Sequence, residues 1–426
     1  MTQRVLLAAD FYPPFIGGAE LQTALLAREL AARGYQVAVA TSWHQGLSEL
    51  ELDDGVRVRR LKGTASGVPA FFSDPAHRRY HPPFPDPGVV VGLRQLVRAF
   101  RPDVIHATGW IAYSCAIGAP PGVPLLLSAR DFGYACPIRT LRRGGGICSG
   151  PALIRCLDSA ARKYGAAKGA AAVAGVFGSR GALMARTSAV HVPSRFAGEM
   201  VERDLIDRHS GVALHVIPDM TRLAPDPPPA DPGHFLDRLP TEPFILFVGA
   251  LQPHKGVREL VEAYEGLEPR PPLVVIGTQW PDSPTSWPPG TSVFTDVPNT
   301  LVQEAWRRSL FGVAPSLWPE TFGGVVTEAM LHRRAVVASG IGGPLDTVEP
   351  GITGLLVPPG DAGALRGAMQ ALIDDPARRQ RMGEAGRERV ERLFATGVVM
   401  PHFERLYASL ARSARSTAVS KSRTAE

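Results

Sequence analysis

Short apolar runs alternate with stretches of helical periodicity along most of the chain. Residues 5–9 form a continuous apolar run, a glycine loop follows at 11–18, and residues 21–33 carry apolar side chains at helical spacing. A short apolar run bounded by turn residues is typical of a buried strand, and regular alternation of such runs with helices indicates a parallel sheet. The same reasoning predicts strands at 37–41, 104–106, 125–128, 244–249, 273–276, around Val313 and at 335–339, and a helix from about Val257.

A proline-dense stretch at residues 221–243 interrupts this alternation. Proline cannot continue a helix or a central strand, so the stretch is interpreted as a linker. The α/β pattern restarts at residue 244, and 426 residues are too many for one ordinary core. The sequence therefore predicts an α/β protein with two Rossmann-like domains, at 1–220 and 244–395. Because ligands bind outside the carboxyl ends of parallel strands, we expect the domains to face each other across a ligand-binding cleft.

Composition narrows the class of protein. The chain is 45% hydrophobic and 20% charged, which is typical of a globular protein. The apolar run near the N-terminus is too short for a signal peptide or a membrane span, so we expect a cytoplasmic protein. Cys136, Cys148 and Cys156 lie in a glycine- and arginine-rich insert without a Cys-x-x-Cys pair. Free thiols are the expectation there, with an incomplete metal site left open.

Positive charge is concentrated in one part of the chain, whose net charge is +6. A basic segment suits an anionic acceptor, peripheral contact with the inner face of a membrane, or nucleic acid, and it is also what a solvated surface looks like. No nucleic-acid-binding motif accompanies it, so nucleic acid is not expected as a partner. Residues 166–186, just beyond, fit either a membrane-surface helix or an alanine-rich internal one. The basic residues are Arg139, Arg142, Arg143, Arg155, Arg162, Lys163 and Lys168, with Asp158 the one acid among them.

The most informative motif occupies residues 319–330, where Glu320 and Glu328 stand eight positions apart around a Phe-Gly-Gly turn. Gly323 and Gly324 allow a close approach of the backbone to a ligand, and the first amides of the following helix lack intrahelical partners. The two carboxylates can accept hydrogen bonds from hydroxyls at two ends of one polyol. A solvated turn before a surface helix is the alternative interpretation.

Two other loops follow predicted strands and offer complementary chemistry. Gly17 and Gly18 lead into a helix N-terminus, where backbone amides can meet a phosphate or a sugar. Lys255 lies in the loop after the strand at 244–249, where its ammonium can offset the charge of a diphosphate. Each loop is weak evidence alone, since many Rossmann-type turns contain glycine and many loops carry a surface lysine.

Five motifs in order resemble family 4 of the retaining GT-B glycosyltransferases: Gly-Gly-Ala-Glu at 17–20, Pro-Asp-Val-Ile-His at 102–106, the lysine-glycine loop, the two-glutamate segment, and Gly-Leu-Leu-Val-Pro-Pro-Gly-Asp ending at Asp361. The resemblance implies a GT-B fold with an acceptor-side N-terminal domain, a nucleotide-sugar-binding C-terminal domain, and a helix at 396–413 that crosses back to the N-terminal domain. We expect residues 414–426 to form a disordered tail.

The resemblance also assigns roles to residues. It implies that Lys255 contacts the donor diphosphate and that Glu320, with the amides of Phe322, Gly323, Gly324 and Val325, holds the transferred sugar. It further implies that amides near Val326 and Thr327 support a phosphate and that Glu328 holds the ribose. Gly17 and Gly18 complete the candidate donor-binding residues.

The chain departs from the family pattern at three places. Ala250 stands where an arginine is common, which leaves Lys255 without its usual cationic neighbour. Arg130 and Asp131 stand where the family often has His-Asp. Arg130 cannot act as a base because it stays protonated, so its role would be electrostatic, and a structural salt bridge is the alternative. We include Arg130 and Asp131 with Lys255 and Glu320 among the candidate catalytic residues. Thr108 replaces the second histidine of a frequent His-x-His pattern, which favours a structural role for His106.

The resemblance implies a retaining hexosyltransferase that uses a nucleotide diphosphate sugar as co-substrate and a lipid, glycan or small metabolite as hydroxyl acceptor. We expect no cofactor and no divalent metal, because lysine and helix amides supply the positive charge and no Asp-x-Asp occurs. A Rossmann oxidoreductase is disfavoured because the first loop lacks Gly-x-Gly-x-x-Gly. A non-catalytic, sugar-nucleotide-binding or scaffold protein remains the second hypothesis.

Overall fold

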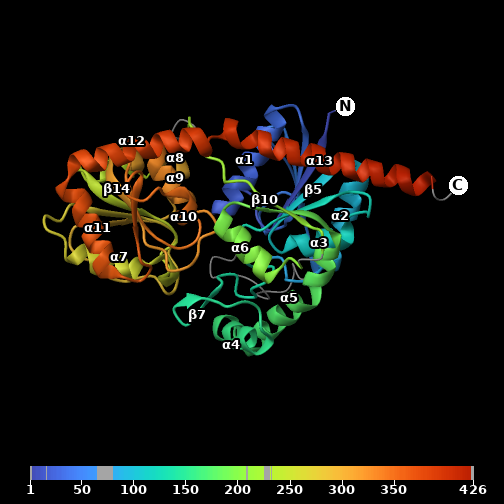
Figure 1. Cartoon of the computed structure of the whole chain (residues 1–426), viewed down its shortest axis with the longest axis horizontal. Coiled ribbons are helices and arrows are strands. Elements are labelled where there is room, and N and C mark those ends of the chain that lie inside the picture. The colour runs from blue at the N-terminus through green and yellow to red at the C-terminus, as the bar shows by residue number, and fades with distance from the viewer. Residues whose placement is uncertain are drawn as a thin grey trace. The chain divides into compact units, whose positions relative to one another are not determined.

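The computed structural model describes residues 2–15, 17–64, 80–207, 210–224, 231 and 233–423, with side chains described as far as residue 416. The chain divides into two compact units, the first made of Met1–Ile217 with Met400–Glu426 and the second of Pro218–Val399 (Figure 1). The segment that we interpreted as a linker is therefore part of the second unit, although its residues 225–230 and 232 lie outside the described residues.

The first unit is built on an eight-stranded sheet of order β10-β9-β6-β5-β1-β2-β4-β3, counted over the described residues. Neighbouring strands are parallel except β3 and β4. The loops after β1, β5 and β6 consequently emerge at one edge of the sheet, which is where the candidate residues of this unit lie. The strands are β1 (Arg4–Ala9), β2 (Gln36–Ser42), β3 (Leu50–Asp53), β4 (Val56–Leu61), β5 (Val104–Thr108), β6 (Leu125–Ser128), β9 (Thr187–Val192) and β10 (Ala213–Val216).

Among the described residues of this unit, six helices connect the strands, and a small antiparallel hairpin, β7 (Arg142–Arg143) with β8 (Gly146–Ile147), precedes the fourth of them. One helix shows how local residues fix where a helix begins. Asp86 precedes Pro87, the first residue of that helix, and its carboxylate accepts a hydrogen bond from the amide of Val89 at 3.1 Å. The helices are α1 (Gly18–Ala32), α2 (Pro87–Phe100), α3 (Ile111–Gly118), α4 (Leu153–Tyr164), α5 (Ala166–Arg186) and α6 (Arg195–Asp204).

The second unit is built on a six-stranded parallel sheet of order β13-β12-β11-β14-β15-β16 among the described residues. Its strands are β11 (Phe244–Val248), β12 (Leu273–Ile276), β13 (Thr291–Phe294), β14 (Ser309–Ala314), β15 (Val336–Ser339) and β16 (Gly354–Val357). Its helices are η2 (Leu236–Arg238), η3 (Pro253–Lys255), α7 (Val257–Glu265), α8 (Asn299–Arg308), α9 (Gly324–Leu331), α10 (Pro344–Thr347), α11 (Ala362–Asp374) and α12 (Pro376–Leu393).

Burial on both faces explains why the strands read as continuous apolar runs. In β11, Ile245 and Phe247 pack into one hydrophobic core, whereas Phe244 and Leu246 pack into another. Successive side chains of a strand point to opposite faces, so a sheet covered on both faces requires apolar residues at every position. The strands predicted from the sequence are confirmed, with ends that differ by at most a few residues.

The last helix, α13 (Thr396–Arg423), belongs to the first unit from Met400 onward. The Tyr407 hydroxyl lies 2.8 Å from Nδ1 of His106, and Gln3 donates to the carbonyl oxygen of Tyr407 at 3.1 Å. Of the tail at 414–426 that we expected to be disordered, residues 424–426 lie outside the described residues and residues 414–423 continue the helix. They contain neither glycine nor proline, and Arg415 pairs with Asp103 at 3.0 Å, so nothing ends the helix at residue 413.

Helix α5 packs one face into the unit through Ala172, Val173, Val176 and Leu183. Six of its eight alanines are exposed, so burial explains one face of this helix and not its alanine-rich composition. None of the described helices combines the length and apolar character needed to cross a membrane.

Candidate functional site

Two close backbone contacts shape the loop between β11 and α7. A Cβ added at Gly277, after β12, would lie 1.7 Å from the carbonyl oxygen of Gly249. A Cβ at Gly256, whose φ is +74°, would lie 1.9 Å from the carbonyl oxygen of Pro315. Both positions therefore require glycine. The amide of Leu317 donates to the His254 carbonyl at 2.8 Å, so this loop lies directly against the segment after β14.

This packing brings Lys255 to Glu320. The Lys255 ammonium lies 2.5 Å from Oε1 of Glu320, and the Ser316 hydroxyl donates to the same oxygen at 2.7 Å. The two side chains keep 22% and 18% of their surface exposed, so a ligand can reach both. Burial raises the pKa of Glu320, but the Lys255 ammonium and the hydrogen bonds from Lys255 and Ser316 outweigh it, and the pKa lies below its ordinary value. Glu320 is therefore a carboxylate at neutral pH.

The turn that carries Glu320 is braced from behind. The amide of Gly343 donates to the Glu320 carbonyl at 2.7 Å, and a Cβ at Gly343 would lie 2.3 Å from the Phe322 Cα. The buried Phe322 ring packs edge-to-face on Phe394, with centroids 5.4 Å apart. Phe322 thus anchors the turn in the core. Gly323 follows in the left-handed conformation, with φ +82°, and α9 begins at Gly324.

The first turn of α9 offers only part of the amide surface that the motif implies. Gly324 is exposed and a Cβ added there meets nothing within 4 Å, so its surroundings are open. The amide of Val326 already donates to the Gly323 carbonyl at 2.9 Å, and the Val326 side chain is buried. Thr327 is buried as well, and its hydroxyl donates to the Gly324 carbonyl at 2.9 Å. The open backbone therefore centres on Gly324 and Val325.

Glu328 lies one helical turn further along α9. The indole N–H of Trp306, on α8, donates to its Oε2 at 3.4 Å. Burial raises the pKa of Glu328 to about 7, and the hydrogen bonds from Trp306 and Asn299 offset this only in part. At neutral pH this carboxyl group is divided between its protonated and ionised forms, in contrast to Glu320.

The first unit carries a separate group of charged residues at the carboxyl edge of its sheet. Asp10 follows β1, and its carboxylate accepts hydrogen bonds from the amides of Trp110 at 3.0 Å and Ile111 at 2.7 Å, where α3 begins. A Cβ on Gly109 would lie 2.5 Å from Oδ2 of Asp10. Burial raises the pKa of Asp10 to about 6, although Arg139 and the two amides counteract it. Asp10 therefore caps α3 from inside the unit.

Arg139 joins Asp10 to Asp131, which follows β6. The Arg139 guanidinium makes two hydrogen bonds to Oδ2 of Asp131, through Nε at 3.0 Å and through a terminal nitrogen, and lies 3.9 Å from Oδ2 of Asp10. The same guanidinium lies over the rings of Tyr80 at 4.7 Å and Trp110 at 5.1 Å. The other Asp131 oxygen accepts from the amide of Gly133 at 2.7 Å. Asp131 is thus held at both oxygens.

Arg130 is next to Asp131 in the sequence, but its charge affects two buried histidines, His106 and His191. Burial lowers the pKa of His106 and His191 well below the ordinary range, and the charge of Arg130 lowers both further. His191 lies 2.7 Å from the Ser128 hydroxyl and 2.8 Å from the Ile217 carbonyl. The histidines are therefore neutral and buried, and His106, bonded to Tyr407, is structural.

Gly17 and Gly18 begin α1, as expected. A Cβ on Gly17 would lie 2.2 Å from Oε2 of Glu20, so the Glu20 carboxylate occupies the space beside the helix N-terminus. A carboxylate in this position repels an anion. In this arrangement the loop suits a hydroxyl-bearing ligand better than a phosphate.

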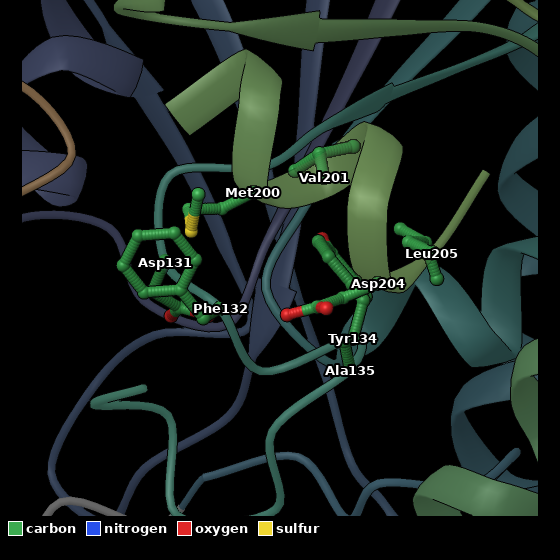
Figure 2. Close-up of a pocket in the computed structure, with 8 residues that line it drawn as sticks. All are labelled: Asp131, Phe132, Tyr134, Ala135, Met200, Val201, Asp204 and Leu205. Carbon is green, nitrogen blue, oxygen red and sulfur yellow. The ribbon is translucent and has the colours of Figure 1, made fainter. Parts of the chain in front are cut away.

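A small pocket lies beside Asp131 in the first unit. Figure 2 shows side chains of α6 on one side and residues of the loop after β6 on the other. Apolar surface from Phe132, Met200 and Val201 adjoins the carboxylates of Asp131 and Asp204. The pocket has room for about one water molecule, and both oxygens of Asp204 accept hydrogen bonds from Arg203, so it is a gap beside Asp131 and not a site for a sugar ring. The lining residues are Asp131, Phe132, Tyr134, Ala135, Met200, Val201, Asp204 and Leu205.

The basic segment divides into two parts. Arg139 is not on the solvated face that its neighbours in sequence suggest, because Asp131 and two aromatic rings hold it inside the unit. The remaining six basic residues lie on β7, on α4 or near the start of α5.

The four cysteines are free thiols. Within the part of the chain that the structure describes, no group of three or more histidine, cysteine or acidic side chains is arranged to hold a metal ion.

Comparisons with known proteins match both units. The family model "Glycosyl transferase 4-like domain" matches residues 17–219, and "Glycosyl transferases group 1" matches residues 236–389. Sucrose-phosphate synthase from Thermosynechococcus elongatus superposes with a TM-score of 0.73 at 22% identity, over 96% of this chain and 100% of that one. HepE from Anabaena, solved with UDP and glucose, gives 0.65 at 15% identity, over 96% and 100%.

The chain belongs to the GT-B glycosyltransferases of family 4. Among curated relatives, the capsular polysaccharide biosynthesis glycosyltransferase CapM of Staphylococcus aureus is 26% identical over 181 residues, which are 40% of this family 4 chain and 47% of CapM. The match thus spans about half the length of that relative.

From the sequence alone, we did not identify the contacts that this family 4 chain makes between residues far apart in the chain. No role was assigned to Asp10 or Trp306, and Arg139 was treated only as one residue of the basic segment. A carboxylate directly after a buried strand was an available signal for Asp10. No short motif marks Arg139, because its partners lie 8 and 129 positions away.

Proposed function

We propose that the protein is a retaining glycosyltransferase that moves a hexose from a nucleotide diphosphate sugar to a hydroxyl acceptor. The observation that carries the proposal is the Lys255–Glu320 pair, 2.5 Å apart and partly exposed beside the N-terminus of α9. Lys255 is the only lysine between residues 218 and 399, so it is the natural counterion for a diphosphate in the second unit.

Donor binding would exchange the partners of this pair. An incoming diphosphate offers Lys255 a second anion, and the Glu320 carboxylate then accepts a hydrogen bond from a hydroxyl of the sugar. The open backbone at Gly324 and Val325 supplies amides for the sugar or phosphate, and Glu328 accepts from the ribose. The solved complex of HepE with UDP and glucose supports a nucleotide sugar as the donor class.

The chemistry we propose is front-face transfer with retention. The bond between the anomeric carbon and the diphosphate oxygen breaks, the acceptor oxygen forms the new glycosidic bond on the same face, and the acceptor proton passes to the departing phosphate. Negative charge develops on the diphosphate, and Lys255 with the α9 amides stabilises it. We propose that no cofactor or divalent metal takes part.

We assign the acceptor to the first unit. Asp131 accepts a hydrogen bond from an acceptor hydroxyl, Arg139 fixes the Asp131 carboxylate, and Phe132 and Met200 lie beside that carboxylate (Figure 2). Arg130 contributes positive charge, and Gly17 and Gly18 offer backbone to the ligand. A lipid, glycan or small metabolite meets these requirements. A cytoplasmic location, with contact to the inner face of the membrane, belongs to the same proposal.

One observation favours a second candidate, a non-catalytic protein that binds nucleotide sugars. Ala250 takes the place of a cation that is common in the family, and Arg258, the nearest arginine in sequence, is exposed on α7. A weakly neutralised diphosphate would permit binding without efficient departure of the leaving group.

The test is thermal unfolding of the protein with UDP-, GDP-, ADP- and TDP-hexoses, followed by nucleotide release with any sugar that stabilises it. A ligand at 100 times its Kd stabilises the folded state by about 2.7 kcal/mol. We expect one nucleotide series to raise the melting temperature and to be turned over equally with and without EDTA. Stabilisation without turnover on a broad acceptor panel would favour the non-catalytic candidate. If no nucleotide sugar changes the melting temperature, the donor assignment is wrong.

A further inference from the structure

The segment that follows Arg139 builds a projection of the first unit with unused apolar surface. Ile147 at the end of β8 is 39% exposed, and Leu153 and Ile154 at the start of α4 are 56% and 82% exposed. The opposite face of α4 is covered by α5, because Cys156 and Ala160 pack against Val173 of that helix. Large aliphatic side chains at such exposure are unfavourable in water unless something covers them.

Contacts within the segment place β7, β8 and the start of α4 together. Arg143 of β7 pairs with Asp158 of α4 at 3.2 Å, and Arg155 donates to the Ser149 hydroxyl at 2.5 Å. Figure 1 shows β7 and α4 at the lower edge of this unit, away from α13. The three apolar side chains therefore belong to one projection, which we call the α4 tip.

Positive charge lies on the α4 tip and along the rest of α4. Between Arg142 and Lys168 there are six basic residues and one acid, Asp158. Arg162 keeps 79% of its side chain exposed while it pairs with Asp158, and Lys168 is exposed at the start of α5. Arg142, Arg143 and Arg155 lie on β7 and in the first turn of α4, so with Asp158 the α4 tip carries a net positive charge of two, and Arg162, Lys163 and Lys168 lie beyond it toward the other end of α4. The basic residues are Arg142, Arg143, Arg155, Arg162, Lys163 and Lys168.

We propose that the α4 tip docks on a bilayer rich in anionic phospholipid. Leu153, Ile154 and Ile147 enter the boundary between headgroups and acyl chains, and the arginines and lysines of β7, α4 and the start of α5 bind the lipid phosphates. A second copy of this chain fits less well, because two tips of the same net charge repel each other. The proposal deepens the membrane contact included in the proposed function by naming the surface that makes it, and docking itself requires neither donor nor acceptor.

Another exposed apolar pair in the same unit provides a matched control. Leu50 and Leu52 on β3 are 65% and 73% exposed, as much as the pair on α4. Acidic residues alternate with them and follow them, namely Glu49, Glu51, Asp53 and Asp54. If exposure alone caused membrane binding, both pairs would contribute equally. If the α4 tip is the docking surface, only Leu153 and Ile154 matter.

The experiment is co-sedimentation of the full chain, without donor, with vesicles of phosphatidylcholine alone or mixed with phosphatidylglycerol. We expect binding to the mixed vesicles that weakens with salt, and at least tenfold weaker binding to phosphatidylcholine. Leu153→Ser with Ile154→Ser should weaken binding at least tenfold, and Arg162→Gln with Lys168→Gln several-fold. Leu50→Ser with Leu52→Ser, and Arg57→Gln with Arg98→Gln, should leave it within twofold of the wild type.

Three outcomes would overturn the proposal. They are no binding to anionic vesicles at low salt, undiminished binding by the Leu153 and Ile154 variant, and equal loss from the β3 variant. Undiminished binding by the Leu153 and Ile154 variant would mean that the protein adsorbs to the vesicles through its charge alone. Since the substituted side chains are exposed, we expect unchanged melting temperatures, which each variant must show before its binding is interpreted. Nucleotide-sugar stabilisation measured on the same samples keeps this test separate from the proposed function.

Discussion

The two units hold a cation against a carboxylate at the same exposure but in different ways. Lys255 and Arg139 are each 22% exposed, and their partners Glu320 and Asp131 are 18% and 21% exposed. Lys255 is a flexible side chain with one carboxylate partner and one aromatic ring, that of Trp318, whose centroid lies 5.4 Å from the ammonium. Arg139 donates hydrogen bonds to Asp131, and its guanidinium lies 3.9 Å from a carboxylate oxygen of Asp10. The same guanidinium lies over the rings of Tyr80 and Trp110. Exposure therefore does not distinguish the two sites, whereas the number of partners does.

The difference indicates what each site can do. Few contacts hold the Lys255–Glu320 pair, so a charged ligand can separate it and take both partners, as a donor site requires. The Arg139 cluster would lose two aromatic contacts and several hydrogen bonds if it opened, so it holds the Asp131 carboxylate in place. The second unit thus presents an exchangeable pair, and the first presents a fixed carboxylate.

Removal of either partner of the exchangeable pair should have the largest effect on activity. We expect Lys255→Ala and Glu320→Ala each to lower kcat/KM about 10²–10³-fold or more, because each removes charge stabilisation made in the transition state. Glu262→Ala, an exposed glutamate of α7, is the matched control. Initial rates of nucleotide release measure the effect. Near-normal rates in both variants, with unchanged melting temperatures, would refute the assignment of the donor site.

Removal of the fixed cation should instead lower stability first. Arg139→Met leaves Asp131 and Asp10 without their shared counterion in a mostly buried position. We expect the free energy of unfolding to fall by about 3 kcal/mol, with partial recovery in Arg139→Lys, which restores charge but not the two-point contact. Arg143→Met breaks only an exposed pair with Asp158 and should cost about 0–1 kcal/mol.

Denaturant unfolding at pH 7 measures these changes. A loss in Arg139→Met no larger than in Arg143→Met would mean that the cluster is not held as the contacts indicate, and the contrast between the two units would disappear.

The same contrast explains which features the sequence could reveal. The Lys255 loop and the Glu320 turn are short segments in which glycine and charge stand next to each other, so a motif identifies them. What the motif does not reveal is that Thr327 is buried or that the Val326 amide is already occupied, because both follow from packing around Gly323.

Residues that meet across the sheet of the first unit have no such local signal. Asp10, Asp131 and Arg139 come from the ends of β1 and β6 and from the loop beyond, and strand order decides that they meet. The strands themselves were predictable because burial on both faces imposes continuous apolar runs. The tail after residue 413 was not, since its composition suits either a helix or a disordered segment.

The smallest expected effect distinguishes the two glutamates of the second unit. Glu320 is ionised throughout the neutral range, whereas the pKa of Glu328 is raised to about 7 by burial. Ribose hydroxyls need the ionised carboxylate as an acceptor, so nucleotide affinity should increase as the pH rises through 7. The ionised fraction grows from about 0.09 at pH 6 to about 0.91 at pH 8, which corresponds to roughly tenfold tighter binding. Glu328→Gln should bind more weakly at pH 8 and keep only the pH dependence that comes from the phosphates of the ligand. Calorimetric titration with the nucleoside diphosphate of the preferred donor, at pH 6, 7 and 8, measures both effects, with Glu262→Ala expected to follow the wild type. The phosphates of the ligand also titrate near pH 6, but that contribution is common to all three proteins and cancels in their comparison.

If Glu328→Gln kept the full pH dependence, the carboxyl group of Glu328 would not be the ribose ligand, and the two-glutamate segment would contribute to donor binding through Glu320 alone.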